Sequence, residues 1–332
     1  GTSATNVYAV NENGVSHSNG SMCSKESSVD LAAVWGSTAA DVWAAGSAGI
    51  LHRIGASWIP ATGLPSGTYQ SLWGRSATDI WAGGSNGIFH YDGIGWTQRS
   101  SLSASSIHGA AGLDAIAVGY DLRHILRLSG SAWVQIGGQA PPDASGDRDT
   151  LRSVSGTSQA DVWASGDFHD NQGGYVLHWD GNDWVDRSLH QTGIWGFYNI
   201  YARTATDVWA LSKGPTNTTG DIYRWQGANW TKTTFGDALM RALWAASANQ
   251  AWAVGKDGKI LAWNGTAWQV QANPVSGTTV NYFAISGTSA TNVWAAGTMG
   301  IVVHWDGSSW TLVPTDTTSD FWGVWTSGSA ST

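Results

Sequence analysis

The chain has 332 residues, a net charge of −8 and only 12 % charged residues, against about 25 % in ordinary soluble domains. Glycine (43 residues) and tryptophan (23 residues) are abundant instead. The negative balance argues against a nucleic-acid partner, which needs a basic surface, and no apolar run is long enough for a membrane-spanning helix.

One short pattern recurs along the whole chain and predicts its elements in order. The clearest copies lie at 156–185 and 287–311, and a half-copy, GTSATNVYAV, opens the chain. Each unit has a strand A such as LAAVWG, a polar turn that often ends in Asp, and a strand B such as DVWA. Strand C (for example YVLHW) and strand D follow. Eight units of about 35–47 residues with four short strands each predict an eight-bladed β-propeller.

The hairpin between strands C and D is the most regular part of the repeat. It carries one glycine per unit, at Gly20, Gly55, Gly93, Gly130, Gly181, Gly227, Gly265 and Gly307. Asn or Asp precedes the glycine in five units, and strand D then begins with Trp in seven units, with Cys23 in the first. Asn-Gly and Asp-Gly favour positive φ angles, so we expect tight type I′ turns.

The two ends of the chain complement each other. The first unit lacks a strand A, and the last strand A (FWGVWT, 321–326) lacks a unit. We therefore expect one blade to be built from 1–30 plus 319–332, which closes the propeller and hides two sheet edges. Seven blades are the alternative, if the degenerate first unit forms none. No linker divides the array, so 1–332 is predicted to be a single domain.

Most tryptophans recur at fixed repeat positions, which indicates packing between blades rather than a ligand surface. Only Trp195 and Trp322 fall outside the pattern. The recurrent histidines of strand C predict a hydrogen bond to a neighbouring blade or turn. We expect the aspartates before strand B to accept local backbone N–H groups. A ligand pocket repeated between every pair of blades is the alternative reading of this regularity.

The repetition breaks on one face, where the B–C and D–A connections lie. These connections lengthen at 137–150, 167–174, 187–197 and 212–220, in adjacent blades (blades 4–6). Loops that depart from a regular scaffold commonly carry function, although long solvated loops are the simpler alternative. The candidate ligand-binding residues are Asp147, Arg148, Asp167, His169, Asp170, Asn171, His190 and Trp195.

These side chains suit a polyhydroxylated ligand, because carboxylates and amides can bind hydroxyls while an indole packs on the C–H face of a sugar. Asp167, His169 and Asp170 are weak candidates for a metal site, and their oxygen ligands would suit Ca²⁺. No other cofactor and no catalytic residue is assigned. The sequence shows no Gly-rich phosphate loop, no Cys/His zinc cluster and no Ser-His-Asp order.

The D-G-x-x-W hairpins resemble a shortened Asp-box, the hairpin of sialidases and other bacterial propellers (Asp92-Gly93 to Trp96, Asp180-Gly181 to Trp184, Asp306-Gly307 to Trp310). The whole repeat is similar to Trp-rich repeats of bacterial surface and secreted propellers, including lectin and tectonin-like ones. That resemblance implies binding of glycans or proteins without catalysis. Sialidase chemistry does not carry over, because it pairs a Tyr nucleophile with Glu and the only glutamates are Glu12 and Glu26.

The sequence thus predicts a secreted or cell-surface recognition protein, without catalysis, that binds a glycan or a cell-surface ligand through the loops of blades 4–6. A protein–protein scaffold or an assembly subunit is the first alternative. An Asp/His-based hydrolase or lyase is the second, because propeller enzymes build their sites from dispersed residues and fold alone does not decide function. The chain begins at Gly1 within a repeat, as a processed product would.

Overall fold

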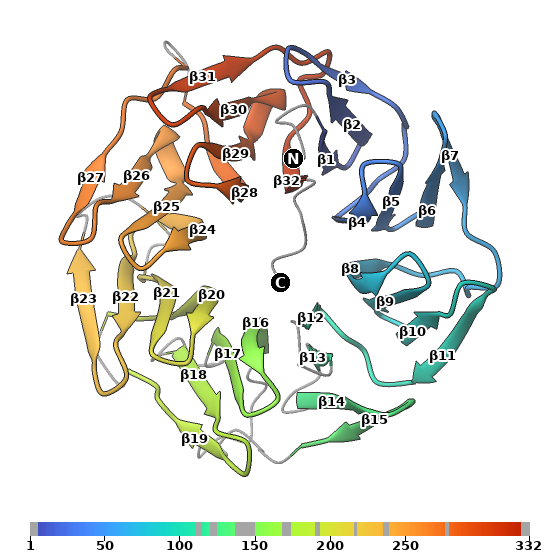
Figure 1. Ribbon diagram of the computed structural model, residues 1–332, viewed down its shortest axis with the longest axis horizontal. Coiled ribbons are helices and arrows are strands. Elements are labelled where there is room, and N and C mark those ends of the chain that lie inside the picture. The colour runs from blue at the N-terminus through green and yellow to red at the C-terminus, as the bar shows by residue number, and fades with distance from the viewer. Residues whose placement is uncertain are drawn as a thin grey trace. The chain divides into compact units, whose positions relative to one another are not determined.

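The computed structural model describes residues 6–109, 115–119, 125–136, 150–167, 174–189, 193–215, 218–234, 239–275 and 279–326. Within these ranges the chain forms strands β1–β32 and two short 3₁₀ helices (Figure 1). The strands make eight four-stranded sheets. The all-β, eight-bladed β-propeller predicted from the repeat is confirmed, and the seven-bladed alternative is wrong.

Each sheet contains one strand of every type. Strands A are β4 (Ala33–Thr38), β8 (Tyr69–Ser76), β12 (Ser106–His108), β16 (Thr150–Ser158), β20 (Gly196–Thr204), β24 (Met240–Ser247), β28 (Tyr282–Ser289) and β32 (Phe321–Thr326). Strands B are β1 (Val7–Asn11), β5 (Asp41–Gly46), β9 (Asp79–Gly84), β13 (Ile116–Val118), β17 (Asp161–Asp167), β21 (Asp207–Lys213), β25 (Gln250–Gly255) and β29 (Asn292–Gly297).

Strands C are β2 (Gly14–Ser18), β6 (Gly49–Ile54), β10 (Gly87–Tyr91), β14 (Ile125–Ser129), β18 (Gly174–Trp179), β22 (Asp221–Trp225), β26 (Ile260–Trp263) and β30 (Val302–Trp305). Strands D are β3 (Cys23–Lys25), β7 (Ser57–Pro60), β11 (Trp96–Ser100), β15 (Ala132–Gln135), β19 (Trp184–Asp186), β23 (Trp230–Thr234), β27 (Trp268–Val270) and β31 (Trp310–Val313). The 3₁₀ helices η1 (Lys256–Gly258) and η2 (Thr298–Gly300) follow β25 and β29.

The chain divides into two compact units. Unit 1 comprises Gly1–Ala82, Tyr91–Thr97 and Arg241–Thr332, and unit 2 comprises Gly83–His90 and Gln98–Met240.

In unit 1, the last strand of the chain completes the first blade. The sheet has the order β3-β2-β1-β32, and β32 runs antiparallel to β1 with Tyr8 opposite Trp325 (Figure 1). Cys23 of β3 is buried, and its backbone N–H donates to the Pro314 oxygen at 2.8 Å. The expected closure by the C-terminal strand therefore forms, and the degenerate sequence of the first unit still supplies three strands to this blade.

The C–D hairpins differ from the expected type I′ turns. In the blade of β16–β19, Trp179 pairs with Trp184, so the loop between them has four residues. The Asp180 carboxylate accepts the backbone N–H groups of Asn182 and Asp183 at 2.9 and 3.0 Å. Only Gly181 has positive φ (102°), whereas a type I′ turn needs two such residues. The Asp therefore acts as a side-chain acceptor that closes the turn.

The expectation for the aspartates before strand B is also wrong in detail. Asp161 accepts from the indole Nε1 of Trp163 at 2.9 Å and lies 2.9 Å from Nε2 of His178, with a further hydrogen bond from Thr157. Its partners are therefore side chains of its own blade rather than local backbone groups. Burial raises the pKa of Asp161, but the hydrogen bonds from these side chains outweigh burial and lower it. The histidine's partner is the turn at the start of strand B, not another blade.

The same triad recurs in other blades. Asp41 bonds Trp43 and His52, and Asn292 takes the aspartate's place beside Trp294 and His304, with distances of 2.8–3.1 Å. The imidazole also stacks on the indole, with ring centroids 3.8 Å apart for Trp43 and His52. The repeated His and Trp are thus structural, as far as the described blades show.

Tryptophans join consecutive blades, as the repeat predicts. In unit 2, Trp163 lies 5.7 Å from Trp225 and 5.9 Å from Trp230 between ring centroids, and the second pair is edge-to-face at 85°. Both partners belong to the next blade along the chain. Trp163 is fully buried. Such pairs contribute about 0.5–1.5 kcal/mol beyond the area they bury.

Glycines of strand A accept the tryptophan of the preceding blade in unit 1. A Cβ added to Gly74 would lie 2.6 Å from the Trp35 ring, and one added to Gly36 would lie 2.8 Å from the Trp325 ring. A real Cβ does not approach a neighbour so closely. In LAAVWG and YQSLWG, the glycine after the Trp therefore lets the next blade pack close to the tryptophan of the blade before it.

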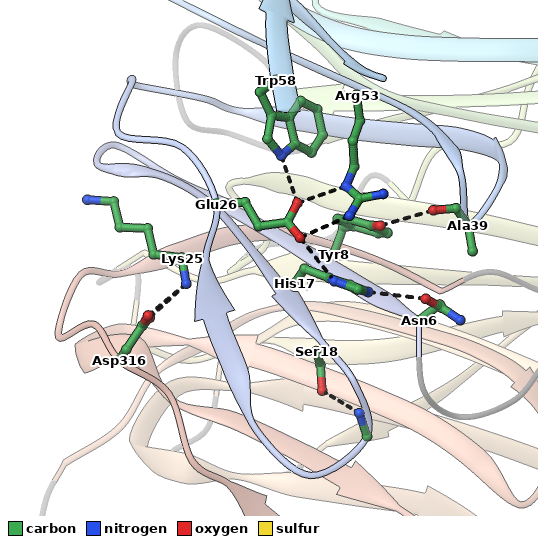
Figure 2. Close-up of polar contacts among 11 residues, drawn as sticks. Asn6, Tyr8, His17, Ser18, Lys25, Glu26, Ala39, Arg53, Trp58 and Asp316 are labelled. Carbon is green, nitrogen blue, oxygen red and sulfur yellow. Dashed lines mark hydrogen bonds and ion pairs between the residues drawn. The ribbon is translucent and has the colours of Figure 1, made fainter. Parts of the chain in front are cut away.

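One contact of unit 1 departs from the repeat. Glu26, just after β3, accepts from Arg53 Nε at 2.8 Å and from Trp58 Nε1 at 2.9 Å, and its other oxygen lies 3.1 Å from Arg53 Nη2 and His17 Nδ1 (Figure 2). Burial alone raises the pKa of Glu26, but these hydrogen bonds outweigh burial and lower the pKa to about 2.

Glu26 stands three residues after the start of strand D. At that position in unit 2, Ile136 and Arg187 accept the indole N–H of the next blade's tryptophan through their backbone oxygens, at 2.7 and 3.0 Å. The carboxylate of Glu26 thus replaces a backbone acceptor and adds an ion pair between the first blade and the second.

Candidate functional site

The structure describes two of the eight predicted site residues, Asp167 and Trp195. The other six lie outside the described residues and stay predictions: Asp147, Arg148, His169, Asp170, Asn171 and His190. The site is therefore built here from the ends of the strands that hold the long connections of unit 2. These are β16, β17, β20 and β21.

Asp167 ends strand β17 and is nine-tenths buried, with 6 % of its surface exposed. Its Oδ2 accepts from Lys213 Nζ at 2.8 Å and from Arg152 Nε at 2.6 Å. No described residue hydrogen-bonds its Oδ1, which is also buried. A buried carboxylate needs such cations, because an unpaired charge in the interior is strongly destabilising.

The two cations come from different blades. Arg152 lies on β16 in the same sheet as Asp167, whereas Lys213 ends β21 of the next blade and is largely buried. The ammonium of Lys213 also lies 5.6 Å from the ring centroid of Tyr198, within reach of a cation–π interaction. The cluster therefore ties two blades together and holds one more positive charge than negative charge.

Trp195 joins this cluster through the backbone. Its N–H donates to the Lys213 oxygen at 2.8 Å, and its side chain is partly exposed. The next residue, Gly196, has φ of 152°, and a Cβ there would lie 1.8 Å from Asp167 Oδ1. Only glycine allows the carboxylate to approach the start of β20, so the sequence Trp-Gly brings the backbone of Trp195 to the ion cluster.

Arg152 is the cluster's most accessible charge. About a third of its side chain is exposed (36 %), and Asp167 holds it through Nε. No hydrogen bond from its terminal nitrogens to the described part of the chain is present, so these nitrogens keep the donor capacity of a guanidinium. The arrangement can bind acceptor oxygens of a ligand, such as hydroxyls or a carboxylate, next to aromatic side chains.

A metal site finds no further support. In the described ranges, no three His, Cys, Asp or Glu side chains gather as metal ligands would. Asp167 is already occupied by two cations, although its proposed co-ligands His169 and Asp170 lie outside those ranges. The Ca²⁺ expectation thus stays a prediction.

Lys213 lies in the long connection 212–220 that the sequence singles out, whereas Arg152 and Tyr198 lie outside all four long connections. Both hold the second position of strand A, where other repeats have residues such as Ala32 and Gln70. A comparison of this position across the eight units would have shown that bulky and charged residues gather at particular blades.

The comparisons with known proteins agree on the fold. No protein-family model and no curated protein matches the sequence. Among solved structures, "YCF48 bound to D1 peptide" is similar with 15 % identity and a TM-score of 0.60, over 83 % of this chain and 92 % of that one. The WD40 repeats of RRP9 are similar with 10 % identity and a TM-score of 0.56, over 80 % and 87 %.

A third similar structure is the extracellular domain of the hybrid two-component system BT3049 from B. thetaiotaomicron. Its identity is 13 % and its TM-score is 0.56, over 86 % of this chain and 39 % of that chain. None of the helices in the described part of this chain has the length and apolar character to cross a membrane. By fold, the chain stands among the β-propeller proteins.

Proposed function

We propose that this chain is a recognition module without catalytic activity, which binds a glycan or other cell-surface ligand at the Asp167–Arg152–Lys213 cluster. The observation that carries the proposal is Arg152, a partly exposed guanidinium that is fixed through Nε to a buried carboxylate and whose terminal nitrogens bond to no described residue. An anchored guanidinium loses little freedom when it binds, so its hydrogen bonds contribute more to affinity.

Sugars fit the neighbouring groups. Hydroxyl and carboxylate oxygens can accept from Arg152, and Trp195 and Tyr198 offer partly exposed rings for the C–H face of a sugar. The engagement of Asp167 Oδ2 by two donors suits a positioning role rather than attack on a substrate. The low charge and the Ser, Thr and Trp content support an extracellular location as part of the same proposal.

A peptide or protein ligand is the second candidate, as in a scaffold or an assembly subunit. The terminal nitrogens of Arg152 would take a peptide carboxylate as readily as a sugar acid. One of the structures similar by fold is a propeller bound to a peptide. This candidate and the glycan differ in the ligand, not in the residue that binds it.

A glycan array that contains neutral and acidic sugars tests the proposal. We expect binding by the wild type and at least a tenfold weaker affinity in Arg152→Gln, because a hydrogen bond to a charged group contributes about 1.5–3 kcal/mol. Arg75→Gln is the matched control, since Arg75 is also a partly exposed strand-A arginine that pairs with an aspartate.

Each result decides between the candidates. An array on which the wild type binds nothing rejects the glycan, and a peptide array read with the same two variants then tests the scaffold. Glycan binding that Arg152→Gln leaves unchanged rejects this cluster as the site. The enzyme alternative depends on Asp167 and His169, so turnover that survives Asp167→Asn with His169→Ala would remove it.

A further inference from the structure

Trp322 of unit 1 is the most exposed tryptophan in the described part of the chain, with 47 % of its surface accessible. Phe321, which precedes it in β32, is fully buried. Alternation along a strand accounts for the direction of the side chain but not for the choice of tryptophan. At the same position of strand A, the other repeats have residues of every kind: Ala32, Gln70, Ser105, Arg152, Tyr198, Arg241 and Phe283.

The indole is held in place by a stack of flat groups. Trp322 lies parallel to Phe283 of β28, with ring centroids 4.5 Å apart and an interplanar angle of 17°. The guanidinium carbon of Arg241 on β24 lies 5.1 Å from the centroid of the Phe283 ring. Strands β28 and β32 lie side by side in this unit (Figure 1). Phe283 therefore fixes the orientation of an indole whose other surface faces solvent.

A carboxylate lies close to Trp322 in the sequence. Asp320 precedes Trp322 by two residues, on the other side of the buried Phe321. Its Oδ1 accepts the backbone N–H of Met299 at 2.9 Å, and no described residue hydrogen-bonds its Oδ2. The carboxylate is thus oriented by the η2 turn and keeps an acceptor for a hydroxyl.

We propose that Trp322 is the platform of a carbohydrate subsite, which takes the apolar face of one pyranose ring while Asp320 accepts hydrogen bonds from its hydroxyls. The site shares no residue with the Arg152 cluster and does not depend on the function proposed there. A ring that packs on Trp322 buries the exposed indole, and the stack on Phe283 means that little side-chain freedom is lost on binding.

The arrangement of the rings favours a neutral sugar over a cation. Quaternary ammonium groups are recognised by cages of several aromatic rings. Trp322 instead forms a parallel stack with Phe283, which presents a flat surface rather than a cage. A flat surface suits the apolar face of a pyranose.

Saturation-transfer difference NMR tests the proposal on the whole chain. The probes are the methyl pyranosides of glucose, galactose, mannose and N-acetylglucosamine at millimolar concentration, with choline as a cationic probe. We expect transfer to the ring C–H protons of at least one pyranoside. Trp322→Ala should weaken the affinity for that sugar about tenfold, because stacking on an aromatic ring contributes on the order of 1 kcal/mol or more.

Two further variants separate this subsite from its alternatives. Trp322→Phe should keep part of the binding, which shows that an aromatic face is needed and that the fold is intact. Gln70→Ala should leave the signal unchanged, because Gln70 holds the equivalent strand-A position of another blade and belongs to neither proposed site. The proposal is overturned by any of three results: no transfer to the four pyranosides, equal affinity in Trp322→Ala, or transfer that depends on Trp322 for choline alone.

Discussion

The negative charge of Glu26 holds the first blade to the second, and its contribution to stability can be measured. The carboxylate is 18 % exposed and its four contacts come from His17, Arg53 and Trp58. They lower its pKa from 4.5 to about 2, although burial acts in the opposite direction. At about 1.36 kcal/mol per pKa unit, the ionised form contributes about 3 kcal/mol to the free energy of unfolding at neutral pH.

The sign of the pH dependence follows from the direction of the shift. A carboxyl whose folded-state pKa is lowered stabilises the fold fully above its unfolded pKa, and this contribution is lost as pH falls toward the folded pKa. For Glu26, the loss begins near pH 5 and amounts to about 2 kcal/mol by pH 3. Glu26→Gln keeps the shape of the side chain and removes this titration.

Urea unfolding at pH 7 and at pH 3 measures the effect. We expect Glu26→Gln to be less stable than the wild type by about 3 kcal/mol at pH 7 and by only about 1 kcal/mol at pH 3. Glu12→Gln is the control, since Glu12 is the other glutamate and is exposed in the turn between β1 and β2. If the free energies of unfolding of the wild type and Glu26→Gln differ by the same amount at both pH values, the charge of Glu26 does not stabilise the fold.

Three more predictions concern stability, each measured by thermal or urea unfolding. Gly74→Ala should destabilise by about 1–3 kcal/mol because its Cβ meets the Trp35 ring, whereas Gly95→Ala, which has open space, should have little effect. Lys213→Met should lower the free energy of unfolding by about 3–5 kcal/mol, because Asp167 then has Arg152 as its only described cationic partner. Adding Asp167→Asn to this variant should recover part of the lost stability. If the double variant recovers none, the buried ion pair is contradicted. Asp161→Asn should be milder than Asp161→Ala, because Asn292 already fills the equivalent position; equal losses would show that the charge, not the hydrogen bonds, matters.

The periodicity of the sequence was sufficient for the blade number and for the closure of the first blade. Strands B and C could be recognised from recurrent residues such as Trp43 and His52, because the equivalent Trp or His stands at the same repeat position in the other units that have it. The recurrence could not show which atoms meet. The carboxylate of Asp41 lies at the start of strand B in the sequence, yet its partners are fixed by the pairing of β5 with β6.

The candidate site was harder to predict because it depends on contacts between elements far apart in the chain. The loop lengths singled out the ends of β17 and β20, where Gly196, the residue after Trp195, lies close to Asp167. Arg152 looked like an ordinary strand residue, since nothing local reveals that it reaches Asp167. The sequence does not distinguish Gly196 from the other glycines. Only the structure shows that a side chain there would collide with the carboxylate oxygen of Asp167.

The pairing of β32 with β1 has a consequence for biosynthesis. During translation, β1 (Val7–Asn11) is made about 310 residues before its neighbouring strand β32 (Phe321–Thr326). The nascent protein must therefore carry an open strand edge until β32 has been made, in a state prone to wrong pairing and to proteases. A circular permutant that begins between β3 and β4 would make all four strands of that blade consecutive and shorten the exposure.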